Sequence, residues 1–173
     1  MSADGITIRT LAPTDSIEEL TELLHRSYAP LGAMGLNYTA VDQTESVTLS
    51  RIGEGTCFLA VDAAGCICGT VLFHPALKET GASWLEQPGV AHFGQLAVEP
   101  TRQRQGLGAR LIETVETHAR SLDAIEIALD TAEPAAHLIA LYSRLGYRFI
   151  EYAQWRGKTY RSVIMSKTLR RSS

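Results

Sequence analysis

Hydrophobic positions recur along this chain with two different periods, and each period predicts one kind of secondary structure. Apolar residues return every three or four positions in residues 17–28, 108–122 and 135–145, which is the spacing of a helix that buries one face. A weaker pattern of the same kind covers residues 41–52. We therefore expect four helices, the second less regular than the others.

Short runs rich in apolar and β-branched residues predict the strands. They are expected at residues 6–9, 56–61, 67–73, 90–98, 124–129, 147–153 and 159–167. The turn sequence D-A-A-G joins the second and third of these into an antiparallel hairpin. A strand, a helix and a strand follow one another over residues 90–129, which implies parallel pairing with a right-handed crossover.

The resulting order of elements, β-α-α-β-β-β-α-β-α-β-β, predicts an α+β protein with a mixed sheet. No repeat or linker interrupts it, so we expect a single domain over residues 1–173. Residues 75–89 have no clear period and are expected to form a long connection. Within it, Trp84 either covers an edge of the core or faces a partner.

Several residues predict where the helices begin and end. Ser16 and Glu19 form a capping box at the start of the first helix. Pro30 and Gly32 are expected to end that helix, which leaves residues 29–38 as an ordered loop. Thr39 with Asp42 is read as the N-cap of the second helix, while Pro134 and Gly146 bound the last one.

Residues 95–111 (Q-L-A-V-E-P-T-R-Q-R-Q-G-L-G-A-R-L) predict an anion site. A strand ends at Val98, Pro100 closes it, and a glycine-containing loop leads directly into a helix. Free backbone amides and the positive end of the helix dipole then point at one place. The loop matches neither G-x-G-x-x-G nor a P-loop, which argues against dinucleotides and nucleoside triphosphates. A plain turn with a helix cap remains the alternative.

Composition and charge narrow the function further. The chain is 45% hydrophobic and 20% charged with a net charge of −3, which argues against nucleic acid or an acidic membrane as the main partner. No apolar leader or membrane-length run is present, so we expect a cytoplasmic protein. Cys57, Cys66 and Cys68 lack zinc-ligand spacing and are expected to be reduced and buried, with no metal site.

A second motif, L-I-A-L-Y-S-R-L-G-Y at residues 138–147, completes a family resemblance. With the earlier L-A-V-E-P-T-R-Q-R-Q-G-L-G-A-R-L, and over nearly the whole chain in element order, the sequence resembles the GNAT family of N-acetyltransferases. Gln103, Gly106 and Gly108 fill that family's loop pattern R/Q-x-x-G-x-G/A. The resemblance implies an acyl-CoA N-acyltransferase fold: a mixed, mostly antiparallel seven-stranded sheet, splayed between its fourth and fifth strands, with helices on both faces.

The resemblance also implies a reaction and its residues. An acetyl group passes directly from acetyl-CoA to an amine in a ternary complex; neither motif contains a cysteine that would carry it covalently. The Val98 N–H polarises the thioester carbonyl. Tyr142 protonates the departing thiolate; otherwise it orients the sulfur or only packs. The expected coenzyme A contacts are Leu96, Ala97, Val98, Gln103, Arg104, Gln105, Gly106, Leu107, Gly108, Ala109 and Tyr142.

The sequence departs from the family pattern at two positions near Tyr142. Ala135 stands where an asparagine often contacts the cofactor arm, and Leu138 replaces a common small residue. Asp130 and Thr131, at the end of the splayed strand, are expected to supply replacement polar contacts to the cofactor.

His92 is the candidate general base, because it stands where many relatives carry a glutamate. Unless a bulge intervenes, alternation places His92, Gly94, Leu96 and Val98 on one face of the strand. An imidazole with a pKa of about 6.5 can take a proton at neutral pH. The alternative is an ordinary packed histidine; His74 is a weaker candidate, and Glu99 is expected to tune the cofactor loop.

The acceptor is expected to meet residues 29–38, the loop after His74 and the turn near Trp155. The side chains singled out there are Tyr28, Met34, Tyr38, Trp84 and Trp155. With few acidic groups among them, a small or partly apolar amine is favoured over a polycation. A non-catalytic acyl-CoA-binding or sensing domain, and transfer of a longer acyl group, remain alternatives. The resemblance also suggests a homodimer through the final strands.

Overall fold

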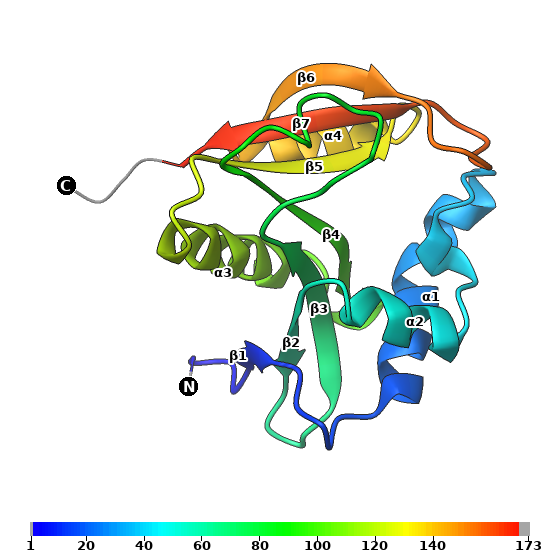
Figure 1. The fold of residues 1–173 in the computed structure, drawn as a ribbon. Helices are drawn as coiled ribbons and strands as arrows, with labels where there is room; N and C mark the ends of the chain where they lie inside the picture. Colours follow the sequence, from blue (N-terminus) through cyan, green and yellow to red (C-terminus); the bar gives the residue numbers. More distant parts are fainter. Residues whose placement is uncertain (1, 170–173) are drawn as a thin grey trace.

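A seven-stranded sheet in the order β1-β2-β3-β4-β5-β7-β6 organises residues 2–169, the part of the chain that the computed structural model describes (Figure 1). The strands are β1 (Thr7–Thr10), β2 (Thr56–Val61), β3 (Ile67–His74), β4 (Val90–Val98), β5 (Glu126–Ala132), β6 (Arg148–Ala153) and β7 (Ser162–Thr168). Neighbouring strands are antiparallel except β4 and β5, which are parallel. The predicted mixed sheet and the β2–β3 hairpin are confirmed.

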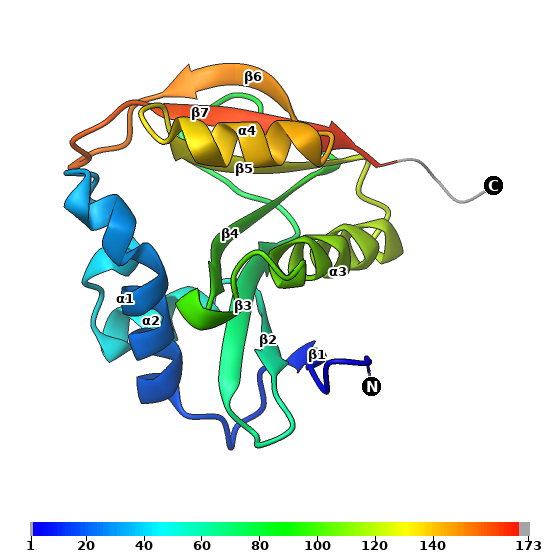
Figure 2. The same cartoon turned by 180° about the vertical axis from the view of Figure 1, so that it is seen from behind.

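The sheet opens between β4 and β5. Their ladder contains only three residue pairs, from Val90↔Glu126 to His92↔Ala128, although both strands continue beyond it. Past His92 the strands separate, and Figure 2 shows β4 running away from the β5–β7–β6 half of the sheet. The predicted splay is therefore confirmed. Backbone groups along the opening lack the strand partners that the rest of the sheet provides.

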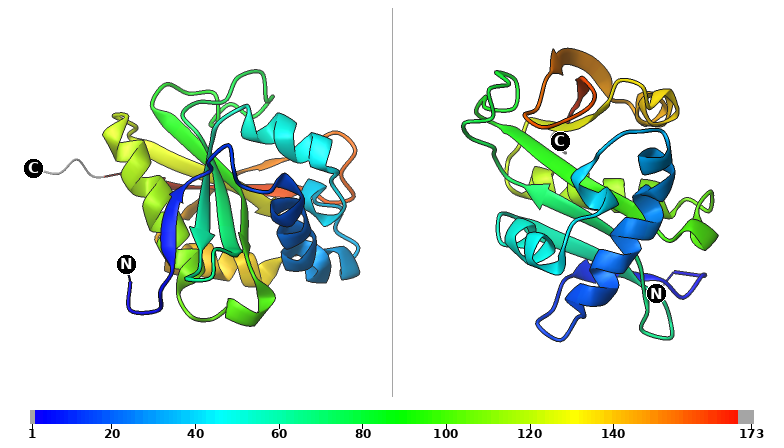
Figure 3. Two further views of the ribbon diagram at one scale, coloured as in Figure 1. Left: turned by 90° about the horizontal axis from the view of Figure 1, so that it is seen from below. Right: turned by 90° about the vertical axis from the view of Figure 1, so that its right-hand side faces the viewer.

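Helices lie on both faces of this sheet. They are α1 (Ile17–Ala33), α2 (Glu45–Ile52), α3 (Leu107–Ser121) and α4 (Ala136–Arg144), with 3-10 turns η1 (Thr39–Val41) and η2 (Pro100–Arg102). On one face, α3 and α4 share a core cluster with β2 to β5 (Figure 2). On the other face, α1 buries Leu20, Leu23 and Leu24 against β2 and β3 (Figure 3). The four predicted helices are all present.

Helix α1 continues past Pro30 and Gly32 to Ala33, so the prediction that these residues end it is wrong. Pro30 lies in the final turn, where its missing N–H costs a single helical hydrogen bond. Leu31 is 7% exposed and packs with Leu36, Ala132, Ala135 and Tyr160. This burial extends the helix. It also fixes the end of α1 beside the C-terminal end of β5 and the N-terminal end of β7.

Helix α2 begins at Glu45, so the predicted N-cap at Thr39 is also wrong. Thr39 starts the short η1 turn instead. The cap is Thr44, whose hydroxyl accepts a hydrogen bond from the Val47 N–H at 3.3 Å. The helix therefore starts after Thr44, the residue that caps it. Its last turn contains Arg51.

The connection 75–89 crosses over β5 and β7 (green loop in Figure 1). Its Ala82 and Leu85 are buried with Val90, Ala128 and Ile164, and Trp84 packs partly buried against the same cluster. Of the two alternatives for Trp84, the structure therefore supports covering of the core edge.

Most strand boundaries agree with prediction to within one or two residues, but two of them differ by three. β5 extends to Ala132, so Asp130 and Thr131 are strand residues that pair with Ile164 and Val163 of β7. The last strand starts at Ser162, three residues later than expected at residue 159. The polar side chains of Asp130 and Thr131 are held in a strand because the antiparallel ladder to β7 supplies their backbone partners.

Cysteine burial and membrane-spanning potential complete the description. Cys57 and Cys68 are buried as expected, but Cys66 is exposed in the β2–β3 turn, where no core residue covers it. Within residues 2–169, no helix has the length and apolarity needed to cross a bilayer, and no three His, Cys, Asp or Glu side chains gather as metal ligands would.

Candidate active site

A β-bulge in β4 decides which of its side chains face which side of the sheet. Thr70 pairs with Ala97 but Leu72 pairs with Gly94, so β4 contains one extra residue between these pairs. Gln95 adopts a left-handed φ of 52° there, and its side chain donates to Oε1 of Gln43 at 2.7 Å. The bulge reverses the alternation of the strand.

Because of this reversal, the predicted common face of His92, Gly94, Leu96 and Val98 is wrong. His92 and Gly94 face a cavity on the α1 side of the sheet, whereas Leu96 and Val98 pack into the core cluster under α3. The side chains of His92, the candidate base, and Val98, the candidate oxyanion-binding residue, therefore lie on opposite faces of the strand.

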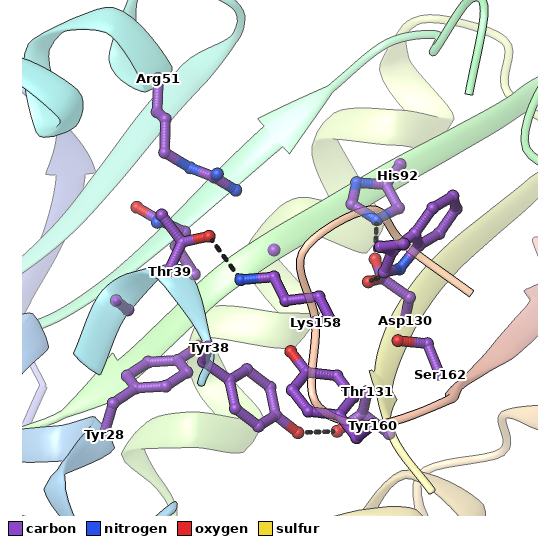
Figure 4. A pocket seen from close by; sticks show the side chains of 14 residues that line it. Tyr28, Tyr38, Thr39, Arg51, His92, Asp130, Thr131, Lys158, Tyr160 and Ser162 are labelled. Carbon is purple, nitrogen blue, oxygen red and sulfur yellow. Dashed lines mark hydrogen bonds and ion pairs between the residues drawn. The ribbon is translucent and has the colours of Figure 1, made fainter. Parts of the chain in front are cut away.

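The cavity has a volume of about 250 Å³ and lies where β4 and β5 have parted (Figure 4). Three tyrosines form much of its wall, and charged side chains reach it from α2, β5 and the turn before β7. The lining residues are Tyr28, Tyr38, Thr39, Ala40, Arg51, His92, Gly94, Gln95, Asp130, Thr131, Trp155, Lys158, Tyr160 and Ser162.

His92, Asp130 and Trp155 form a hydrogen-bonded group at one end of the cavity. His92 Nε2 lies 2.9 Å from Oδ1 of Asp130, and Trp155 Nε1 donates to Oδ2 at 3.0 Å. Burial by itself raises the pKa of Asp130, but the bonds from His92 and Trp155 outweigh it and hold that pKa below its usual range. The carboxylate is ionised and only accepts hydrogen bonds, so Nε2 of His92 carries a hydrogen.

His74 is the second neighbour of His92. The Nδ1 atoms of the two rings are 3.4 Å apart, longer than an ordinary hydrogen bond of about 2.7–3.2 Å. Burial, followed by the charges of His92 and Arg51, lowers the pKa of His74 to about 4. His74 is therefore neutral at pH 7, and Nδ1 of His92 is only weakly engaged.

The loop after β4 presents a row of backbone amides without internal partners. Gly106 has a φ of 83° and precedes α3, and no side chain caps the helix. The N–H groups of residues 105–109 donate to no acceptor within residues 2–169. Arg104 is exposed, whereas Arg102 is held by Asp62 at 3.0 Å. Unpaired amides at a helix start are the geometry of an anion site, and the binding of the donor by this loop and Arg104 stays a prediction.

Two further predicted residues border the opening. The Val98 N–H points away from β3 and donates only a long hydrogen bond of 3.4 Å to the Ser27 hydroxyl on α1. Glu99 is held by Arg26 of α1 at 2.7 Å, which ties the end of β4 to that helix. The Val98 donor is therefore free of the strand ladder, as an oxyanion-binding amide must be.

Tyr142 lies on α4 against Phe93 and Tyr147, with ring centroids 6.4 and 6.2 Å away. Its hydroxyl makes no hydrogen bond to another residue in the range 2–169. Burial raises the pKa of Tyr142 well above its usual value, and Tyr38 and the Asp130 carboxylate raise it further. The phenol thus stays protonated and available as a donor.

Some predicted residues serve other purposes. The Tyr38 hydroxyl lies 2.9 Å from the Thr131 hydroxyl and accepts the Ala132 N–H at 2.8 Å, so Thr131 is engaged by the protein itself. Met34 is 49% exposed and, like Trp84, lies outside the cavity lining. Tyr28, Tyr38 and Trp155 do line it.

Sequence reasoning missed Arg51, Lys158 and Tyr160. Arg51 belongs to the helix with the weakest pattern, and Lys158 to a segment read only as a turn. No local signal singled these residues out: Arg51 stands three residues before Glu54, and Lys158 lies beside Gly157 in a short polar segment.

The structure has two features that a group-transfer enzyme needs. A loop with unpaired backbone amides precedes α3, and a cavity with titratable side chains lies where the sheet opens. Two solved structures share this fold: an Elizabethkingia anophelis GNAT family acetyltransferase with acetyl-CoA bound (TM-score 0.69, 17% identity, 96% of this chain and 99% of that chain) and a Bacillus subtilis acetyltransferase in complex with CoA (TM-score 0.68, 17% identity, 95% and 99%).

Sequence similarity gives the family. A model described as the acetyltransferase (GNAT) family matches residues 17–147. The chain is also 31% identical over 165 residues to the S-(2-succino)cysteine N-acetyltransferase of Bacillus subtilis (strain 168), covering 92% of this chain and 94% of that protein. The chain belongs to the GNAT acetyltransferase family and is an N-acetyltransferase that takes its acetyl group from acetyl-CoA.

Proposed function

We propose that this enzyme transfers the acetyl group directly to the amine of a small molecule held in the cavity beside β4 and β5. The observation that carries the proposal is the His92–Asp130 pair, 2.9 Å apart, at the point where the two strands separate. An amine must lose a proton before it can attack a thioester. The pair places a base and an anion beside the opening between β4 and β5, where the two substrates would meet.

On the donor side, the amides of residues 105–109 bind the pyrophosphate at the start of α3. Acetyl-CoA supplies the activated acetyl group as its thioester. The Val98 N–H donates to the carbonyl oxygen as negative charge develops on it. Replacing its long bond to Ser27 with this shorter, charge-assisted one stabilises the transition state.

On the acceptor side, Asp130 is the more accessible member of the pair, with its side chain 30% exposed against 10% for His92. Asp130 attracts the positively charged amine, and His92 accepts the proton on the weakly engaged Nδ1. The neighbouring carboxylate stabilises the imidazolium that forms. Tyr142 then donates a hydrogen bond, and ultimately a proton, to the departing sulfur.

Replacing Gly106 with alanine is expected to weaken acetyl-CoA binding and to destabilise the protein by about 1–2 kcal/mol. The reason is that φ is 83° at this position and an L side chain is strained there. The matched control is Gly108→Ala, whose Cβ would meet Val98 Cγ2 at an ordinary 3.8 Å. Calorimetric titration with acetyl-CoA should show reduced affinity for Gly106→Ala alone; equal affinities would exclude the loop from donor binding.

The proposal is tested by a panel of amines with release of free thiol as the readout. The panel should contain polyamines, aromatic amines, peptides and amino acids, including the S-(2-succino)cysteine named for the Bacillus subtilis relative. Acetyl-CoA is expected to raise the melting temperature, and at least one small amine should release thiol in proportion to acetylated product. A melting shift with no amine accepted would instead indicate a binding or sensing protein.

A further inference from the structure

Two cations face the cavity without an acidic partner. Arg51 reaches it from the last turn of α2, and Lys158 from the turn before β7 (Figure 4). Neither takes part in any ion pair formed within residues 2–169. Lys158 donates to two neutral oxygens, the Asn37 carbonyl at 2.8 Å and the Thr39 hydroxyl at 3.0 Å.

Arg51 is the more unusual of the two. Its Nε is fully buried and has no hydrogen-bond partner among the described residues. A buried donor left unsatisfied costs about 1–3 kcal/mol, and native proteins keep few of them. Most arginines that pack against a protein surface find a carboxylate or a carbonyl. The rest of the half-buried Arg51 side chain reaches the cavity (Figure 4) and forms no ion pair within residues 2–169, which leaves its charge available to an anionic group of the ligand.

The charges around the cavity do not cancel. Burial, followed by the like charge of Arg51, lowers the pKa of Lys158, although Asp130 and Asp42 act in the opposite direction. Asp130 is the single carboxylate among the lining residues, and both of its oxygens already accept hydrogen bonds from His92 and Trp155. Asp42 is exposed and pairs with neither cation. The cavity therefore carries an excess of positive charge.

We propose that Arg51 and Lys158 bind a carboxylate of the acceptor, so that the substrate is an amine that also carries a free carboxylate, as an amino acid does. This rests on the proposed function. The amine lies at the Asp130 end, the carboxylate at the Arg51 end, and Tyr28, Tyr38 and Tyr160 contact the carbon skeleton between them. A volume of about 250 Å³ is small beside typical ligand pockets of about 300–1,000 Å³, which suits a small metabolite.

This arrangement distinguishes free amino acids from two other kinds of amine. A polyamine brings no anion and adds positive charge beside Arg51 and Lys158. A peptide N-terminus presents an uncharged amide where an amino acid presents its carboxylate. Both lack the carboxylate that Arg51 and Lys158 would bind, and an acceptor site whose polar groups are left unpaired discriminates strongly against such substrates.

The test compares an accepted amino acid with its own primary amide, which differs only at the carboxylate. Wild-type enzyme is expected to prefer the acid by at least tenfold in kcat/KM. Arg51→Met and Lys158→Met keep chain length while removing charge, and each should raise KM for the acid about tenfold or more with little change for the amide. Arg51→Lys should restore part of the preference, because it keeps the charge but loses the planar fork.

Arg156→Met is the matched control, since it removes an exposed cation from the same turn as Lys158. It is expected to keep the wild-type preference. Melting temperatures with and without acetyl-CoA show that each variant is folded and binds its donor. If wild-type enzyme acetylates amines but treats acid and amide alike, or if the Arg51 variant loses both equally, the carboxylate site is wrong. If no amine is acetylated, the proposed function itself fails.

Discussion

Tyr142→Phe is expected to lower kcat by about 100-fold or more while leaving acetyl-CoA affinity unchanged. Loss of a positioned acid typically costs about 10²–10⁴ in rate, and the Tyr142 hydroxyl has no structural partner within residues 2–169 whose loss would disturb the fold. Removing it leaves the ring and its contacts with Phe93 and Tyr147 in place. Steady-state kinetics with a saturating amine, alongside calorimetric titration with acetyl-CoA, measure the two quantities separately.

Tyr147→Phe is the control for this experiment, because its ring centroid lies 6.2 Å from that of Tyr142 in the same core cluster. Its hydroxyl donates to the buried Glu116 at 3.0 Å, away from the cavity. This variant should lose stability but keep kcat. Unchanged turnover in Tyr142→Phe would leave that residue a packing role, and a weaker acetyl-CoA complex would assign it to binding.

Asp130→Asn is expected to lower kcat/KM for the amine by about 100-fold. The Asp130 carboxylate lies 2.9 Å from Nε2 of His92, where it stabilises the positive charge that the ring takes up with the proton of the amine. His92→Gln should cost a similar factor. Because the two side chains act as one unit, the double variant should be hardly worse than either single one.

The comparison of Asp130→Asn with the wild type has to separate a loss of stability at low pH from a loss of activity. The pKa of Asp130 is lowered in the folded protein, so its ionised form contributes stability that is present above the usual carboxyl pKa of about 3.9 and is lost as pH falls below it. Rates should therefore be compared above pH 5, with melting temperatures at each pH. Values of kcat/KM that are the same in both single variants and the wild type would assign the proton to water or to another group.

Helical periods and short apolar runs were sufficient to predict the four α-helices and the seven strands of residues 2–169, because these elements bury one or both of their faces. The ends of the elements were less predictable. Pro30 is a local signal to stop a helix, yet Leu31 is buried against Tyr160, a residue far along the chain. The same holds for the bulge at Gln95, a non-glycine residue with positive φ whose side chain is held by Gln43.

The candidate site also has a part that the sequence predicted and a part that it did not. The donor loop is continuous in sequence, so its glycines and its helix start were visible together. The cavity is assembled from distant segments: Lys158 reaches Thr39, and His92 reaches Asp130, through contacts that no spacing encodes. His92 was found because a motif passes through it, whereas Arg51 belongs to no motif and required the fold to bring it to the cavity.

The bulge at Gln95 makes β4 a strand of two independent halves. Downstream of it, the pairs Thr70↔Ala97 and Gly69↔Val98 lock the register that positions the donor amide of Val98. Upstream, His92 and Gly94 face the acceptor cavity. With the roles proposed above, substitutions before the bulge are expected to change the choice of acceptor while the register around Val98 is kept. Evolution and protein engineering can both use this separation.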